Sequence, residues 1–187
     1  MPAWSNTSVV VVSSELDLLT GAGAGELLAA AVETAGGELL TWAPTQVDHR
    51  PGTGSTVSYR TTVRWGARDQ AETLAATTAL AHLPELSHDR PQPLLLERDD
   101  LRVAVWRYPL DPFLPHLPAA CDSRSVAELL TSIGRPTAAA DVVLDVPVYR
   151  PGRRAVVQVT TPAGTTFVKV VRPSQVEDLH RRHLLLH

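Results

Sequence analysis

Near residue 60, strand-forming residues alternate with polar ones, and this run limits most strongly what the chain can fold into. Residues typical of a half-buried strand occupy every second position of this run, namely Val57, Tyr59, Thr61, Val63 and Trp65. Successive side chains of a β-strand point to opposite faces, so the run predicts a strand with one buried face. Similar runs bounded by turn-forming residues predict three further strands, over 38–47, 72–78 and 101–108. We expect these strands to form an antiparallel meander whose apolar face needs a covering helix.

That helix is expected over residues 25–35, just before the first strand. Leucine, alanine and valine recur there at spacings of three and four, and two glycines follow as a stop signal. The glycine-rich run 21–25 before it permits two interpretations. One is a flexible loop, and the other is a dinucleotide-binding loop whose backbone amides approach a pyrophosphate. The second interpretation lacks the acidic residue that closes the next strand in such sites, which favours the loop.

Proline marks the connections that follow. The segment 83–93 holds too many prolines for a regular element, and 111–118 is expected to be an extended connector for the same reason. Ser125 and Glu128 form a capping-box pattern that opens a further helix. The expected organisation is a cap-like α+β domain, a proline-rich connector with a helix, and a last unit, over 1–110, 111–140 and 141–187 respectively.

Lys169 is the only lysine in the chain, which also contains sixteen arginines. Its neighbours are the apolar pairs 167–168 and 170–171, which predict a mostly buried strand whose charge faces a cleft. An ammonium group is a compact charge on a flexible stem, which suits it to contact a phosphate oxygen. The alternative interpretation is a lysine retained by chance on an exposed strand.

The order of elements around Lys169 is strand, loop, strand, turn, lysine-bearing strand and helix, as in the small lobe of protein-kinase-like folds. The segments 148–157 and 166–170 resemble the small lobe of actinobacterial phosphotransferases related to aminoglycoside and sugar kinases. Residues 105–112 are similar to the region before that lobe, and the earlier elements are similar in order to the cystatin-like cap of maltokinase-type proteins. The resemblance implies an α+β fold, with a helix on an antiparallel sheet followed by a partial protein-kinase-like small lobe.

The resemblance also implies ATP-dependent phosphoryl transfer, with Mg²⁺, to a hydroxyl of a sugar or aminoglycoside. In this resemblance Lys169 contacts the nucleotide phosphates. A tight turn covers the same phosphates and contains Gly152 with Arg150, Arg153 and Arg154. An exposed basic hairpin tip is an equally weighted explanation of that turn. Glu177 could pair with Lys169, although its place three residues after Ser174 indicates a helix cap instead.

The catalytic segment of kinase-like folds, a histidine and an aspartate followed five residues later by asparagine, is absent from the sequence after Lys169. The later metal-binding aspartate is absent as well. We therefore expect the amino-terminal portion of a phosphotransferase, inactive at this length. The competing class is a non-catalytic binding or assembly module in which Lys169 is a surface residue.

Composition and charge argue against several other classes. The net charge is −3, and no arginine cluster with interleaved aromatic residues is present, which argues against nucleic acid as a partner. The sequence shows neither a secretory signal nor a membrane span, so we expect a cytoplasmic protein. Cys121 lacks the signature of a catalytic thiol. His180, His183 and His187 share a helical face, but no carboxylate or cysteine completes a metal site, so a solvated face is expected.

Overall fold

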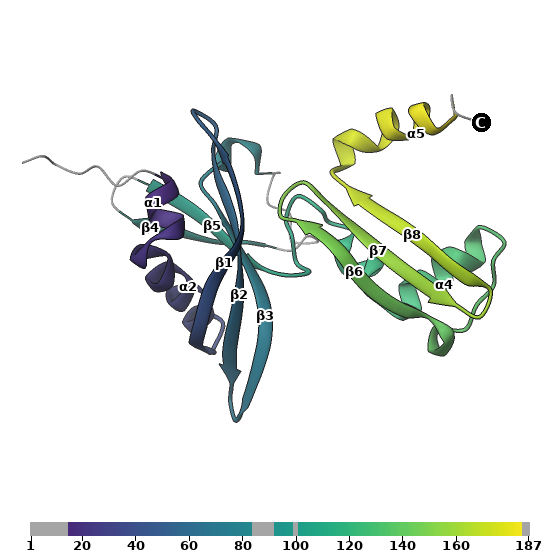
Figure 1. The fold of residues 1–187 in the computed structure, drawn as a ribbon, viewed down its shortest axis with the longest axis horizontal. Helices are drawn as coiled ribbons and strands as arrows, with labels where there is room; N and C mark the ends of the chain where they lie inside the picture. Colours follow the sequence, from purple (N-terminus) through teal and green to yellow (C-terminus); the bar gives the residue numbers. More distant parts are fainter. Residues whose placement is uncertain (1–14, 84–91, 99–100, 185–187) are drawn as a thin grey trace, which may run out of the picture.

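The structure is a computed structural model that describes residues 15–83, 92–98 and 101–184 (Figure 1). It is mixed α+β with two antiparallel sheets, which confirms the predicted class. The first sheet, in the order β1-β2-β3-β5-β4, consists of β1 (Glu38–Arg50), β2 (Gly54–Trp65), β3 (Arg68–Thr77), β4 (Leu94–Arg98) and β5 (Leu101–Arg107). The second, in the order β6-β7-β8, consists of β6 (Val143–Arg150), β7 (Arg154–Thr161) and β8 (Gly164–Val171). The helices are α1 (Glu15–Thr20), α2 (Ala22–Thr34), α3 (Leu117–Ala120), α4 (Ser123–Ser132) and α5 (Val176–Leu184), with 3-10 turns η1 (Leu80–His82), η2 (Ala139–Asp141) and η3 (Pro173–Gln175).

Helices α1 and α2 cover one face of the first sheet (Figure 1), which confirms the helix-on-sheet prediction. The alternation in β2 sets the buried face, because Val57, Tyr59 and Val63 are fully buried against leucines of the two helices. The Tyr59 hydroxyl donates a hydrogen bond of 2.6 Å to the Leu19 carbonyl oxygen. Burial raises the pKa of Tyr59, so this hydroxyl stays protonated and tethers α1 to the sheet.

Residues 22–25 of the glycine-rich run are helical and Gly21 is the N-cap, so both loop interpretations are wrong. α2 begins at Ala22 and contains Gly23 and Gly25. A Cβ atom on Gly25 would lie 2.6 Å from Trp42 Nε1, so α2 approaches β1 closely only without a side chain here. Glycine costs about 1 kcal/mol relative to alanine inside a helix. Burial of the α2 leucines against the sheet outweighs that loss.

The four predicted strands of the first sheet all form. β3 begins at Arg68, earlier than predicted, because Gly66 with a φ of 60° closes a short turn that pairs Trp65 with Arg68. The sequence does not predict β4, since its three consecutive leucines show no alternation. That strand is defined by its pairing with β5. Most of the proline-rich segment 83–93 lies outside the described residues.

The segment 111–118 is a compact set of turns leading into α3, and the predicted extended connector is wrong. Asp111, Phe113 and Leu114 are buried, and Leu114 and Leu117 join a core formed with α4 and β7. The prolines exclude long regular elements, as expected, but burial of the apolar residues between them folds the segment onto the second sheet. The domain limits at 110 and 140 stay predictions.

The predicted starts of the last two helices are wrong by a few residues. Asp122 is the N-cap of α4, and its carboxylate accepts hydrogen bonds from the backbone N–H and the hydroxyl of Ser125, both at 2.8 Å. These bonds lower the pKa of Asp122. Ser174 lies inside η3, which runs directly into α5, so Ser174 does not cap that helix. Asp and Ser are both good N-caps, and sequence alone does not rank two candidates three residues apart.

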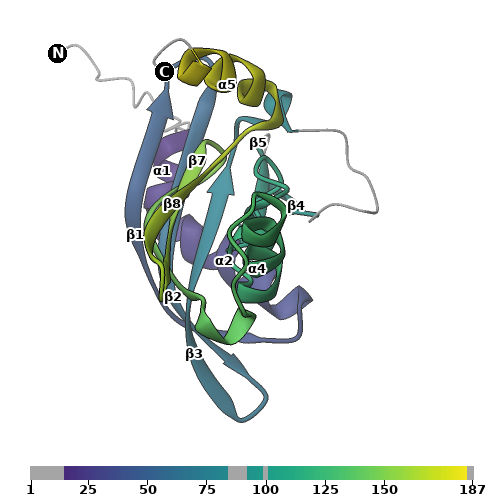
Figure 2. The same cartoon turned by 90° about the vertical axis from the view of Figure 1, so that its right-hand side faces the viewer.

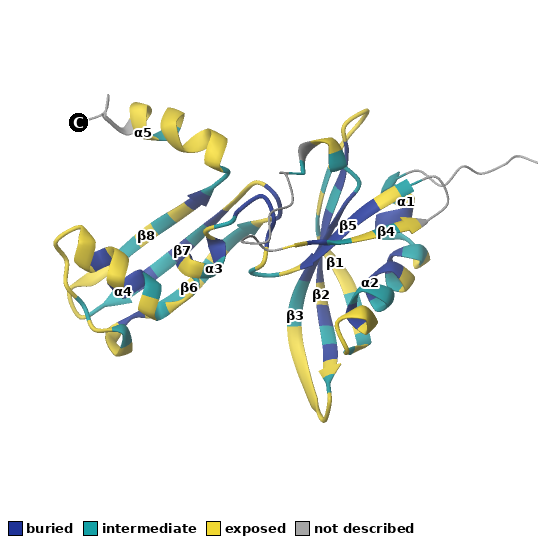
Figure 3. Ribbon diagram, turned by 180° about the vertical axis from the view of Figure 1, so that it is seen from behind, coloured by how far each residue is buried: buried dark blue, intermediate teal, exposed yellow. Residues whose placement is uncertain are grey.

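The second sheet has one covered and one open face. Val157 and Val159 of β7 are fully buried against α3 and α4. On the opposite face Phe167 is 62% exposed and Val143 is 65% exposed, and Figure 3 shows β8 as largely exposed or intermediate. The strands pair as the predicted hairpins, but the prediction of a mostly buried strand around Lys169 is wrong.

Candidate functional site

The turn between β6 and β7 carries the three arginines predicted to contact phosphates. The Arg153 backbone N–H donates a hydrogen bond of 3.0 Å to the Arg150 carbonyl oxygen, which closes the turn. Gly152 has a φ of 65°, and a Cβ atom there would lie 3.2 Å from the Phe113 ring. Glycine is therefore needed here for its backbone conformation and for the close approach of the ring.

A buried carboxylate holds this turn in place. The Oδ2 atom of fully buried Asp111 accepts hydrogen bonds from the Gly152 backbone N–H at 2.7 Å and from the Tyr149 hydroxyl at 3.0 Å. Its Oδ1 atom accepts one from the Phe113 backbone N–H at 2.9 Å. Burial raises the pKa of Asp111, although these bonds and the charge of Arg172 oppose the shift. The Gly152 N–H is engaged inside the protein as a result.

The same network joins the two sheets. Trp106 on β5 donates from Nε1 to the Tyr149 hydroxyl oxygen at 3.0 Å, and its ring packs edge-on against Phe113. Burial, together with the charge of Asp111, raises the pKa of Tyr149. Arg172, just after β8, donates from Nε to the Gly152 carbonyl oxygen, and its guanidinium carbon lies 4.9 Å from the centre of the Phe113 ring. The turn is thus fixed from both sheets.

Beside the turn lies a cavity of about 320 Å³, named here the basic cavity. Arg150, Arg154 and Val171 are directly paired across β6, β7 and β8, so they share one face of the sheet with Lys169. This is the open face, on which Lys169 and Phe167 are both exposed. The charged residues that line the basic cavity are Arg150, Arg153, Arg154, Lys169, Asp178 and Arg182.

The positive charges of the basic cavity are poorly neutralised by the protein. Within the described ranges, Arg153 is the one lining cation that forms an ion pair, with Asp48 at 2.9 Å. Arg150 and Arg154 lie directly opposite each other on β6 and β7, and like charges in such positions repel. Five cations and one carboxylate focus a positive potential in a hollow of the surface, which favours binding of a polyanion.

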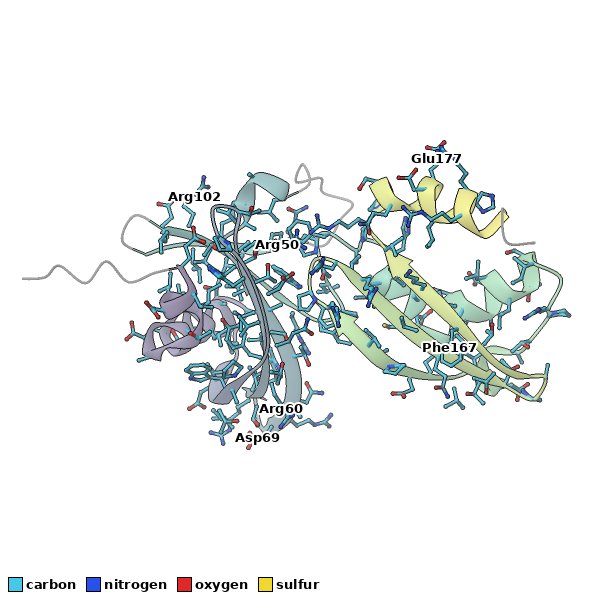
Figure 4. The ribbon with its side chains drawn as sticks, turned by 45° about the horizontal axis from the view of Figure 1, so that its top comes forward. Arg50, Arg60, Asp69, Arg102, Phe167 and Glu177 are labelled. Atoms are coloured by element: carbon cyan, nitrogen blue, oxygen red, sulfur yellow. The ribbon has the colours of Figure 1, made fainter. Side chains whose placement is uncertain are left out.

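Helix α5 turns back over the end of the second sheet (Figures 1 and 2). Its residues line one side of the basic cavity. Asp178 and Arg182 line the cavity, whereas Glu177 is exposed and points away from it (Figure 4). Glu177 forms no ion pair with Lys169 in the part of the chain that the structure describes. The structure therefore gathers Lys169 and the three turn arginines in one cavity, but leaves Glu177 apart.

Sequence reasoning misses Asp111, Arg172, Asp178 and Arg182. A signal for Asp111 does exist, since it stands alone among apolar residues and prolines, and a carboxylate in such a setting needs hydrogen-bond donors. Asp178 and Arg182 have no comparable signal. Which face of α5 turns toward the sheet depends on the direction that the chain takes through η3, and sequence does not fix that direction.

Cys121 and His180 are not among the residues that line this cavity. Cys121 Sγ lies 3.0 Å from the Tyr108 hydroxyl, and burial raises the pKa of the thiol, which keeps it protonated at neutral pH. His187 lies outside the described residues, and within the described ones no three His, Cys, Asp or Glu side chains are grouped to hold a metal ion. No helix in the described ranges has the length and apolar character needed to cross a membrane.

No protein-family model, curated protein or solved structure matches this chain. A functional assignment rests on the geometry and charge of the basic cavity.

Proposed function

We propose that the basic cavity binds the phosphate groups of ATP, and that this chain is the amino-terminal portion of an ATP-dependent phosphotransferase acting on a sugar or aminoglycoside hydroxyl. The observation that carries the proposal is the convergence of Lys169 and four arginines on one cavity with a single lining carboxylate. The lysine supplies a compact charge that reaches one phosphate oxygen. The guanidinium groups bind phosphates in a planar, bidentate manner.

Side chains carry this binding, in place of the backbone amides of a glycine-rich loop. The Gly152 N–H is already bonded to Asp111, so it is not free to meet a phosphate. The arginines of the turn project instead from a backbone that Asp111 and Arg172 hold rigid. A rigid support reduces the entropy lost when a ligand is bound, which favours affinity.

The fold supports the proposal at a coarser level. The helices on a five-stranded antiparallel sheet agree in element order with a cystatin-like cap, and the three-stranded sheet followed by α5 agrees with the start of a kinase-like small lobe. In such lobes a strand lysine meets nucleotide phosphates. A cap and a lobe together are what the proposed phosphotransferase would contain.

Mg²⁺ does not fit the described residues of this cavity. The ion prefers six oxygen ligands and is usually held through one or two carboxylates together with substrate phosphates. Asp178 is the one carboxylate among the described lining residues, and it already lies 3.7 Å from Arg181. The basic residues alone account for the proposed phosphate binding.

The proposal is tested by titrating the full chain with ATP in a calorimeter. The Lys169→Gln variant should bind ATP about tenfold more weakly, because one charge-assisted contact to phosphate is lost. Arg124→Gln is the matched control, since it removes an exposed cation from α4, on the covered side of the sheet, and should leave affinity unchanged. Equal ATP affinities of the wild type and Lys169→Gln would show that Lys169 does not contribute to ATP binding.

A non-catalytic assembly module is the second candidate, and the open face of the second sheet favours it. Phe167 and Val143 are both largely exposed there, and exposed apolar residues on one sheet face are typical of surfaces that meet a partner. If the wild type binds no ATP but associates with increasing concentration in sedimentation equilibrium, this second function is supported instead.

A further inference from the structure

A second cavity lies where the two sheets meet, and it is named here the junction cavity. Its volume is about 290 Å³, and its walls come from the β1–β2 hairpin, the end of β3 and the β6–β7 turn. Its charged lining residues are Asp48, Arg50, Arg153 and Arg172. Arg50 belongs to the end of the first sheet that faces the second (Figure 4). Three segments far apart in the sequence therefore bring arginines to one hollow.

One carboxylate serves two of these arginines. Asp48 Oδ2 lies 2.9 Å from Arg153 Nη1, and its other oxygen lies 3.8 Å from Arg50 Nε. The second distance is too long for a hydrogen bond, so Arg50 is attracted by the charge of Asp48 without being bonded to it. Arg50 and Arg153 therefore share a single negative charge and retain donors for a further acceptor.

Arg172 is positioned as the third cation of the junction cavity. Its Nε–H is bonded to the Gly152 carbonyl oxygen and its guanidinium lies over the Phe113 ring, which fixes the plane of the group. Burial lowers the pKa of Arg172, the charge of Asp111 opposes this shift, and the charges of Arg153 and Arg50 add to it. The buried carboxylate of Asp111 has its oxygens engaged by other donors. No acceptor for its terminal amino groups is found among the described residues.

We propose that the junction cavity is a binding site for a phosphate group, either free phosphate or the phosphate of a small monoester, held by Arg50, Arg153 and Arg172. A phosphate offers three or more acceptor oxygens to guanidinium forks, which no single carboxylate of the protein does here. Part of the site is already rigid, because Arg172 is held by the turn and the ring. The bound anion replaces Asp48 as the partner of Arg153 and adds a bonded partner for Arg50.

This site adjoins the basic cavity, with which it shares Arg153, but it also has lining cations of its own. Arg150, Arg154, Lys169 and Arg182 line the basic cavity alone, whereas Arg50 and Arg172 line the junction cavity alone. Arg153 lines both, so it is unsuitable as a test residue. The inference does not depend on the proposed binding of ATP, and variants that are specific to one cavity separate the two.

The experiment is a calorimetric titration of the full chain with inorganic phosphate, and separately with phenyl phosphate, at constant ionic strength. Arg50→Gln should weaken phosphate binding about tenfold, because it removes one charge-assisted partner. Arg50 has an exposed side chain, so this substitution is expected to leave the fold intact, which circular dichroism checks. Asp48→Asn should tighten binding about tenfold, since it removes the internal competitor for Arg50 and Arg153.

Arg124→Gln is the matched control, because Arg124 is exposed on α4 and lines neither cavity, so phosphate affinity should stay unchanged. Arg154→Gln removes a cation of the basic cavity alone and reports phosphate that binds there instead. If inorganic phosphate binds more tightly than phenyl phosphate, the ligand is free phosphate. If phenyl phosphate binds more tightly than inorganic phosphate, the ligand is a phosphate monoester. The proposal is overturned if the wild type shows no binding at millimolar phosphate. It is also overturned if Arg50→Gln binds as the wild type does, or if affinity is lost in Arg154→Gln instead.

Discussion

Asp111 fixes the geometry of a surface site from the interior of the protein. Its two oxygens accept hydrogen bonds from Phe113, Tyr149 and Gly152, which belong to two segments about forty positions apart in sequence. Each bond satisfies a donor that is buried or partly buried, and a buried donor without an acceptor is costly. The position of the arginine-bearing turn thus depends on a residue that touches neither cavity.

The Asp111→Ala variant should be less stable than the wild type by about 3 kcal/mol, because three donors lose their acceptor together. Urea unfolding of both proteins measures this difference. The turn should also lose its fixed position, so ATP affinity should fall although no residue lining the basic cavity has changed. An unchanged free energy of unfolding would mean that water replaces the carboxylate at no loss.

The Asp111→Asn variant separates the charge of Asp111 from its hydrogen bonds. Burial raises the folded-state pKa above the unfolded value of about 3.9, so the folded protein holds this proton more tightly. The stability that this group contributes is complete below pH of about 4 and is lost as pH rises through the folded pKa. The free energy of unfolding of the wild type, relative to Asp111→Asn, should therefore fall as pH increases. A difference independent of pH would show that the pKa is not raised.

At the scale of elements, the sequence predicts the strands far better than it predicts the start of α2. Alternation such as that of Val57, Tyr59 and Val63 reports a buried face directly, because the period of a strand is two. The glycines at the start of α2 instead predict a loop from local propensity. Their helical state follows from burial of the α2 leucines against the sheet, and Gly25 lets Trp42 of β1 approach the helix closely. Local sequence carries no information on that contact, so the prediction fails there for a tertiary reason.

The Gly25→Ala variant tests this explanation. Alanine favours a helix over glycine by about 1 kcal/mol, yet the added methyl group would meet Trp42 Nε1 at 2.6 Å. The Trp42 ring is packed against Tyr59, so we expect a net loss of stability of about 1 to 2 kcal/mol. Thermal or urea unfolding measures it. In a Trp42→Leu background the same substitution should become stabilising, and destabilisation of similar size in both backgrounds would exclude the indole as the cause.

At the scale of the whole molecule, both cavities depend on how separate segments meet. The sequence identifies Lys169 and the turn arginines as a basic group, and the structure gathers them with Arg182 of α5. The sequence gives no indication that Arg50 lies near Arg153, because the rest of the first sheet, the connector and α4 separate the two along the chain. A site whose residues are close together in the sequence can be predicted from the sequence. A site formed by residues of two sheets can be identified only when the packing of the sheets is known.

The chain as a whole should bind a nucleotide without transferring its phosphate. Phosphoryl transfer requires a group that positions the acceptor hydroxyl and metal ligands that neutralise charge on the transferred phosphate. The basic cavity offers cations for binding, but Asp178 is the one carboxylate among its described lining residues, and the histidine-aspartate-asparagine segment is absent after Lys169. Purified protein should therefore bind ATP yet release ADP at the background rate with any sugar or aminoglycoside, as measured by a coupled assay. Reproducible turnover that disappears in Lys169→Gln would show that a complete active site lies within these residues.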